Sequence, residues 1–159
     1  MKKAKDIMTK EVATCRPDTN LAATMELMWD KDCGVLPVVD NENKVVGIIT
    51  DRDIAIAVGT RNKLASDINV GEVMTERVYS CSPEDNLEDV IDLMSTTKVR
   101  RLPVIDHELK LHGILSLNDV ALFAEEAKGK EQPDISYRDA AITLKAICHH
   151  PKQRSFARA

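Results

Sequence analysis

Apolar residues recur at helical spacing in two separate stretches of the chain. They stand three or four positions apart, at Leu21, Met25 and Met28 and again at Leu87, Ile91 and Met94. Each stretch is followed by a β-rich run, a short polar turn and a second apolar run, over residues 35–49 and 101–115. The pattern predicts a helix and then a β-hairpin in each half, with a second helix beginning at Thr50 or Ser116.

The two halves are copies of one unit. When the sequence is shifted by 66 positions, residues 6–55 align with residues 72–121 without a gap, and nineteen of the fifty pairs are identical. Chance matching at ordinary residue usage gives roughly three. A short extended piece precedes each first helix, at residues 12–14 and 78–80. We therefore expect an α+β fold built from two β-α-β-β-α units.

A unit of this size is marginal alone, since a domain of about 60 residues buries only about 60% of its unfolded surface. We expect the two units to pack about a pseudo-twofold axis, with two related clefts between them. The predicted boundaries are residues 1–66 for the first unit with its connector and 67–127 for the second. Residues 128–159 form a basic C-terminal extension, with a helix expected over 136–149 on which Tyr137, Ala141, Leu144 and Cys148 share a face.

Charge is distributed unevenly along the chain. Residues 1–127 hold 15 Lys and Arg against 23 Asp and Glu, whereas residues 128–159 hold 7 against 3. The acidic body argues against binding to nucleic acid, and the basic end is interpreted as a solvated tail. No apolar run approaches the roughly 20 residues that span a bilayer, and the charged residues 1–6 are not followed by an apolar segment, so we expect no signal peptide. The expected location is therefore the cytoplasm, without membrane contact.

One motif, Gly-x-x-[Thr/Ser]-x-x-Asp, occurs at the strand-to-helix junction of both units, over residues 47–53 and 113–119. A hydroxyl followed three residues later by an acid is close to a helix capping box. The same geometry suits a ligand, because a helix N-terminus attracts phosphate and a carboxylate accepts hydrogen bonds from a ribose diol. The sequence leaves both interpretations open.

Two copies of this motif, each after a Met-Thr start and a Leu-Pro-Val-x-Asp strand, resemble a tandem pair of CBS domains, the Bateman module, in a stand-alone CBS-domain protein. The resemblance covers roughly residues 4–125. It implies a regulatory module that binds an adenosine compound such as AMP, ADP, ATP, S-adenosylmethionine or NAD. It also implies roles for residues of this chain: Asp53 and Asp119 as ribose anchors, Thr50 and Ser116 beside them, and Thr14 and Ser80 near adenine.

A phosphate also needs a cation. Arg101 stands directly before the Leu-Pro-Val strand of the second unit, a place that some family members fill with Arg, and the first unit has Val35 there. We hypothesise that Arg101, with Arg100, faces phosphate across the cleft anchored by Asp53. Arg52 is a second candidate. The alternatives are a solvated strand end for the first two and a surface position for Arg52.

Other chemistry finds little support in the sequence. There is no phosphate-binding P-loop, no dinucleotide fingerprint and no serine nucleophile elbow, so we expect no enzyme activity. The four cysteines lack zinc-site spacing and are interpreted as reduced and mostly buried. Residues 40–44 superficially resemble a calcium loop but fit a hairpin turn, and residues 148–150 are interpreted as a tail end. We therefore predict no metal.

These observations predict a non-catalytic sensor that binds an adenosine nucleotide between its two units. Its output is expected to be a change in its own assembly or an effector protein that the sequence does not identify. A homodimer is expected from the resemblance, and Met25, Met28 and Trp29 are candidates for its interface, although such residues are more often core. The alternative function is a dimerisation scaffold with vestigial clefts. The sequence does not say which nucleotide binds, or whether one or both clefts are used.

Overall fold

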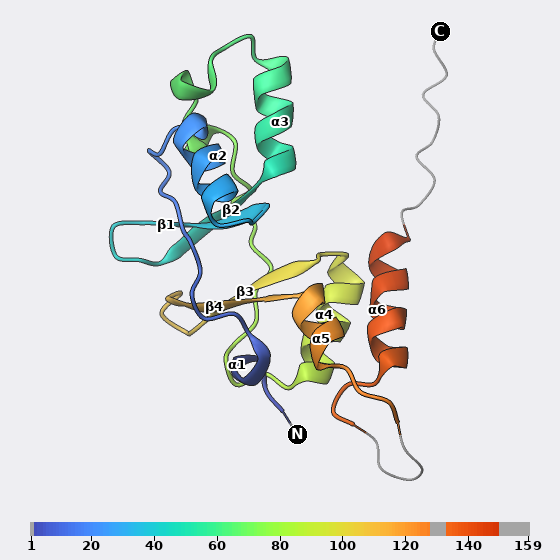
Figure 1. Ribbon diagram of the computed structural model, residues 1–159. Coiled ribbons are helices and arrows are strands. Elements are labelled where there is room, and N and C mark those ends of the chain that lie inside the picture. Colours follow the sequence, from blue (N-terminus) through green and yellow to red (C-terminus); the bar gives the residue numbers. More distant parts are fainter. Residues whose placement is uncertain (1, 128–132, 150–159) are drawn as a thin grey trace, which may run out of the picture.

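The computed structural model describes residues 2–127 and 133–149 (Figure 1). Repeat 1 contains α2 (Leu21–Asp30), β1 (Val35–Val39), β2 (Val45–Thr50) and α3 (Asp51–Thr60). Repeat 2 has the same order, with α4 (Leu87–Thr97), β3 (Arg101–Ile105), β4 (Leu111–Ser116) and α5 (Leu117–Phe123). The remaining helices are α1 (Ala4–Ile7), α6 (Tyr137–Cys148) and two short turns, η1 (Ala65–Asp67) and η2 (Val70–Glu72). The predicted α+β class is confirmed, and no helix in the described ranges is long and apolar enough to cross a bilayer.

Each repeat forms a two-stranded antiparallel sheet with the same register. Val35 pairs with Thr50 in repeat 1, and Arg101 pairs with Ser116 in repeat 2. The predicted extended pieces at 12–14 and 78–80 form no strand of their own. Instead the next residue, Cys15 or Cys81, makes one parallel bridge to the first strand of the hairpin. The first β element of each unit is thus a single bridging residue.

The hairpin turns are closed by a carboxylate in each repeat. The Oδ1 atom of Asp40 accepts hydrogen bonds from the backbone N–H groups of Glu42 (2.8 Å) and Lys44 (3.0 Å). Asp106 makes the equivalent bonds in repeat 2. Because the carboxylate is used to close the turn, the structure favours the hairpin interpretation of residues 40–44 over a calcium loop.

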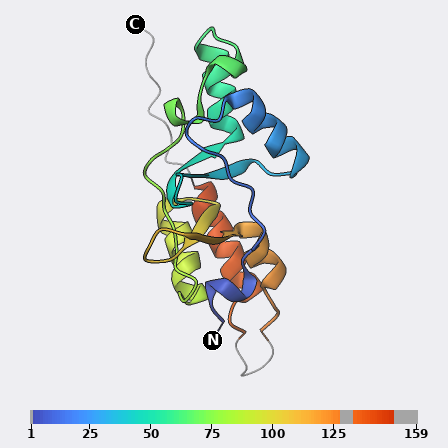
Figure 2. The same cartoon turned by 90° about the vertical axis from the view of Figure 1, so that its left-hand side faces the viewer.

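The N-terminal segment of each unit packs on the other unit. Ala4 is fully buried in the core of repeat 2, and Thr9 bridges to Ile114. In the same way Val70 is buried in the core of repeat 1, and Thr75 bridges to Ile48. Figure 2 shows the chain running from α1, beside repeat 2, up to α2 in repeat 1. Both cores therefore draw on residues from both sides of the predicted boundary at 66, which stays a prediction.

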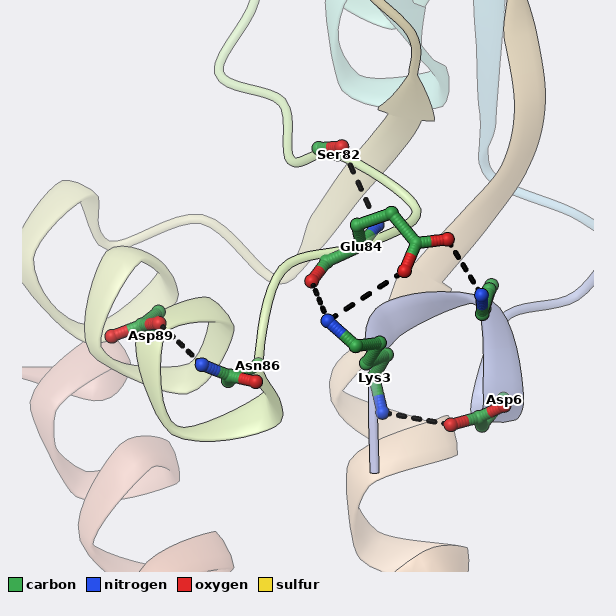
Figure 3. A network of polar contacts seen from close by, with 7 residues as sticks. Lys3, Asp6, Ser82, Glu84, Asn86 and Asp89 are labelled. Atoms are coloured by element: carbon green, nitrogen blue, oxygen red, sulfur yellow. Dashed lines mark hydrogen bonds and ion pairs between the residues drawn. The ribbon is translucent and has the colours of Figure 1, made fainter. Parts of the chain in front are cut away.

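Ion pairs hold the N-terminus against repeat 2 (Figure 3). The ammonium groups of Lys3 and Lys5 donate to Glu84, which belongs to the turn before α4, at 2.6 Å each, to its backbone carbonyl and its carboxylate respectively. The backbone N–H of Lys3 donates to Asp6 at 2.8 Å, which caps α1. Exposed ion pairs contribute little individually. Together with the burial of Ala4, they fix where the chain starts its passage between the repeats.

The helix expected over 136–149 is α6, and it packs against α4 and α5 of repeat 2. Thr143 and Ile147 are buried there, at 2% exposure each. The face shared by Tyr137, Ala141, Leu144 and Cys148 is the exposed one. Of the predicted extension, residues 128–132 and 150–159 lie outside the described residues, and so does His150 of the 148–150 motif.

Candidate ligand-binding site

Both motif carboxylates form capping boxes at the start of a helix. In repeat 1 the Oδ2 atom of Asp53 accepts from the backbone N–H of Thr50 at 2.9 Å and from its hydroxyl at 2.7 Å. In repeat 2 Asp119 accepts from the N–H and the hydroxyl of Ser116 in the same way. Each hydroxyl in turn accepts from the N–H of its Asp. Both hydroxyl protons and one oxygen of each carboxylate are therefore already used within the chain.

Asp119 also borders a pocket of about 320 Å³ between the repeats. The pocket is lined by Val12, Ala13 and Val35 before the midpoint of the chain and by Arg101, Ser116 and Asp119 after it. The second oxygen of Asp119, Oδ1, has a single long contact in the described residues, from the hydroxyl of Thr9 at 3.4 Å. This oxygen remains available to a ligand hydroxyl.

The charges around this pocket are mixed. Arg101 and Lys31 are the two cations of its lining, and both are exposed to solvent. Glu11 and Asp32 add negative charge beside Asp119. A ligand that combines hydroxyl donors with a single anionic group matches this arrangement, because the carboxylate accepts from hydroxyls while the two cations face the anion.

The predicted arginines separate in the structure. Arg101 lines the pocket of Asp119, and Asp53 is not among the residues of that pocket. The hypothesis that Arg101 faces phosphate across the cleft anchored by Asp53 stays a prediction, and the ladder pairs Arg101 with Ser116 of its own hairpin. Arg100 and Arg52 are exposed and do not line this pocket.

Thr14 and Ser80, the residues expected near adenine, do not line the Asp119 pocket. Thr14 lines a separate hollow beside the hairpin turns, with Glu42 and Lys110, while Val12 and Ala13 line the Asp119 pocket. Ser80, which corresponds to Thr14, is half-buried. Sequence reasoning also missed Lys31 and Asp32, which follow α2. The alignment of the two repeats gave no signal for them, because the corresponding residues of repeat 2 are the uncharged Thr97 and the oppositely charged Lys98.

The Asp53 side has a different composition. Four positions that correspond to residues of the Asp119 pocket carry cations or an aromatic ring here: Arg77 for Glu11, Tyr79 for Ala13, Lys98 for Asp32 and Arg52 for Asn118. The two cations of that pocket, Lys31 and Arg101, correspond to the uncharged Thr97 and Val35. The guanidinium of Arg77 lies 5.4 Å from the centre of the Tyr79 ring. The ammonium of Lys98 donates to the backbone carbonyl of His149 at 2.6 Å, at the end of α6. This side is therefore more basic than the pocket of Asp119.

A second hollow, of about 610 Å³, lies between α2 and α3 on repeat 1. We call it the α2/α3 groove. Its lining is mainly apolar or small, with Met25, Trp29, Ala55, Val58 and Gly59. Two residues that follow α2, Asp32 and Cys33, line both this groove and the Asp119 pocket. One short loop therefore separates the two hollows.

The cysteines are all reduced, and two of the four are buried. Burial raises the pKa of the Cys15 thiol to about 11, and burial with the nearby Asp85 charge raises the pKa of Cys81 to about 12. Such thiols stay protonated and act as packing groups. Within the described residues, no cluster of three or more His, Cys, Asp or Glu side chains is arranged to hold a metal ion.

The family model named CBS domain matches the chain twice, over residues 4–59 and 70–126. These two segments contain the duplicated motifs, both hairpins and the capping boxes. The chain belongs to the CBS domain family. The resemblance seen in the sequence is thus confirmed.

Two relatives illustrate how CBS pairs occur. The CBS domain-containing protein YhcV of Bacillus subtilis is 34% identical over 141 residues, which cover 87% of this chain and 99% of that protein. Inosine-5'-monophosphate dehydrogenase of Methanocaldococcus jannaschii is 38% identical over 120 residues, which cover 76% of this chain and 23% of the enzyme. The chain therefore spans under a quarter of the enzyme it matches.

Two similar solved structures contain adenosine compounds. The CBS domain pair of protein MJ0100, in complex with 5'-methylthioadenosine and S-adenosyl-L-methionine, has a TM-score of 0.70 at 27% identity and covers 77% of this chain and 94% of that one. CBSX2 in complex with AMP has a TM-score of 0.68 at 33% identity, with coverage of 77% and 95%. Both agree with a fold of two CBS repeats.

Proposed function

We propose that this CBS pair is a non-catalytic regulatory module that binds an adenosine-containing ligand between its repeats. The carrying observation is the pocket at Asp119, which combines residues of both repeats with two cations and a carboxylate oxygen whose single contact, from the Thr9 hydroxyl, is 3.4 Å long. The ribose diol donates to Oδ1 of Asp119, and Arg101 with Lys31 faces the phosphate. The ligands of the similar structures, AMP, S-adenosylmethionine and methylthioadenosine, support this class.

The pocket at Asp119 is the primary site in this proposal. The apolar backbone stretch at Val12 and Ala13 lies where a flat base can approach, and Ser116 keeps the helix start and the carboxylate in position. Asp53 serves a second, weaker site whose extra cations, Arg52 and Arg77, favour additional phosphates such as those of ADP or ATP. Arg100, Thr14 and Ser80 stay predictions without support from the pocket lining.

Ligand binding is proposed to act by changing the self-association of the chain. Asp32 and Cys33 line both the pocket and the α2/α3 groove, so a ligand that moves this loop changes the surface offered to a second copy. Binding shifts assembly only to the extent that affinity differs between the two states. A homodimer is the proposed assembly. An effector protein and a cytoplasmic location stay predictions.

A specific observation favours a second candidate, a dimerisation scaffold without a ligand. Asp53 and Asp119 both have a structural role in a capping box, which needs no ligand to explain it. The duplicated motif is fully accounted for by helix capping in that case. The pocket would then be a gap left where two repeats meet.

Isothermal titration calorimetry with AMP, ADP, ATP, S-adenosylmethionine and NAD distinguishes the two candidates. The sensor predicts saturable binding of at least one of these compounds and a thermal stabilisation that grows with concentration, about 2.7 kcal/mol at 100 times the dissociation constant. A folded chain that binds none of them and gains no stability supports the scaffold. Turnover of a bound nucleotide by the purified chain would contradict the non-catalytic assignment.

A further inference from the structure

The α2/α3 groove carries apolar side chains that no described part of the chain covers. Trp29 is 86% exposed, Met25 48% and Val58 38%. Ala55 and Gly59 are small, so another backbone can approach α3 closely at these positions. An exposed hollow with this lining is typical of an interaction surface rather than of ordinary solvated surface.

The equivalent groove of repeat 2 already has an occupant. It lies between α4 and α5, and α6 packs against both helices. The residues that correspond to Met25 and Val58 are Ile91 and Ala124, and they are only 8% and 6% exposed. The protein itself therefore demonstrates that a groove between these two helices accepts a third helix.

The helix that fills this groove has a second apolar face. Thr143 and Ile147 face repeat 2, whereas Tyr137, Ile142 and Leu144 are 61%, 53% and 47% exposed. Figure 1 shows α3 and α6 along the same side of the molecule, one in each repeat. A single chain thus carries α3, which lines the groove, and α6, which carries the exposed apolar face, along the same side.

The charges of the two surfaces are complementary. The groove lining contains Asp32 and Asp51 and no Lys or Arg. The exposed face of α6 carries Arg138 and Lys145, and its only acid, Asp139, is bound to the N–H of Ser136 at 2.9 Å. Two grooves placed face to face would bring like charges together without a compensating base, which is unfavourable at an interface. The α6 face supplies the missing bases.

We propose that the α2/α3 groove receives the outer face of α6 from a second copy of this chain. The contact is reciprocal, because each copy offers both surfaces on one side, so a twofold axis closes the dimer with two equivalent contacts. The dimer then buries Trp29 and Ile142 at its centres and pairs the groove acids with Arg138 and Lys145. This inference rests on the homodimer of the proposed function and assigns its surface.

Sedimentation velocity on the full chain tests the assignment with two variants and one control. Trp29→Glu changes the groove and Ile142→Glu changes α6, and each is expected to raise the dimer dissociation constant by about 30-fold or more, as central interface residues do. Leu109→Asn is the control: it changes an apolar residue on a hairpin turn that is 48% exposed, close to the 53% of Ile142, and leaves the dimer intact. Far-UV circular dichroism verifies that all three variants are folded.

Charge reversal in mixed dimers tests which surfaces meet. Asp51→Lys alone and Arg138→Glu with Lys145→Glu in another chain each weaken self-association. An equimolar mixture of the two chains forms a heterodimer, because one contact has both charges reversed and the other is unchanged. This rescue requires that the groove of one copy faces α6 of the other.

Each other outcome overturns the assignment. If only Trp29→Glu weakens the dimer, two grooves pair with each other. If neither variant weakens it, the dimer forms elsewhere, and the homodimer of the proposed function survives without this surface. A wild-type chain that stays monomeric at high concentration overturns both the surface and the homodimer, while calorimetry reports ligand binding independently.

Discussion

Repeat 1 and repeat 2 have the same element order and sheet register but different surroundings. Met25 and Ile91 occupy the same position of the first helix, yet the former is 48% exposed and the latter 8%. The difference is caused by α6, which packs on repeat 2 alone. The two copies of one unit thus present different surfaces, because one added helix packs on α4 and α5 of the second copy.

The two copies differ again at the motif they share. Asp53 and Asp119 make the same capping box, but only Asp119 borders the pocket that contains Arg101. The side of Asp53 has Arg77 and Tyr79 stacked at the matching positions. The motif itself therefore explains the helix start in both repeats, and the residues around it decide which copy can take a ligand.

Weakening the packing of α6 on repeat 2 should have the largest effect on stability. Ile147→Ala leaves a cavity between α6 and the core of repeat 2, where Ile147 is 2% exposed, and is expected to lower the free energy of unfolding by about 3 kcal/mol. The matched control is Ile56→Ala on α3, where the side chain is 53% exposed. Urea denaturation should find the control within about 0.5 kcal/mol of wild type. If Ile147→Ala lowers the free energy of unfolding as little as the control does, α6 does not stabilise repeat 2.

Substitution of Arg101 or of its neighbour Arg100 tests which cation of repeat 2 contributes to the pocket. Arg101→Ala should weaken AMP binding about tenfold and leave adenosine binding unchanged, since the guanidinium faces the phosphate alone. Arg100→Ala, at the neighbouring position outside the pocket lining, is the control and should bind AMP as wild type does. Calorimetric titration of both variants with both ligands measures this. An equal loss for adenosine would contradict the phosphate role of Arg101.

The two hairpin turns have the same backbone conformation at one position, but only repeat 1 has a residue there that adopts it readily. Asn43 and Leu109 occupy the same turn position with φ of 60° and 65°, a left-handed conformation that Asn tolerates and Leu rarely adopts. Leu109→Asn is expected to stabilise the chain by about 0.5–1 kcal/mol, and Asn43→Leu to destabilise it by a similar amount. Thermal unfolding measures both. A destabilised Leu109→Asn variant would mean that the Leu side chain makes a contact that outweighs the strain.

The smallest effect concerns acid stability. The hydrogen bond from His112 at 2.9 Å, helped by two backbone N–H groups, holds the pKa of Asp106 at about 2. Because this pKa lies below the ordinary value of about 3.9, Asp106 stabilises the fold above pH 4, and the contribution disappears as the pH falls toward 2. Repeat 1 has Val46 in place of His112. In His112→Val, the carboxyl NMR titration of Asp106 should move to higher pH, and an unchanged midpoint would contradict this cause.

Much of the fold followed from the repeat. Leu36 and Leu102 are fully buried at matching positions, and the turns at Asn43 and Leu109 lie where the polar runs predicted them. Periodicity finds such features because burial imposes the spacing of apolar residues. It did not find that the first β element is a single bridge at Cys15, since one bridging residue leaves no alternation to detect.

The site could be predicted only in part. The motif led to Asp119 and Ser116, because a hydroxyl and an acid at that spacing have a mechanism that the sequence displays. Lys31 and Asp32 could not be found in this way, since they reach the pocket through the packing of one repeat on the other. The same packing brings Arg101 into the lining of the Asp119 pocket. Contacts between distant segments carry no local pattern.

The central claim is that ligand binding depends on one motif carboxylate more than on its copy. Asp119→Ala and Asp53→Ala remove the same capping box, so their losses of stability should match at about 1 kcal/mol. Calorimetric titration with AMP should show that the tighter binding event is lost in Asp119→Ala and retained in Asp53→Ala. AMP affinities that fall equally in the two variants, or in neither, would contradict the account.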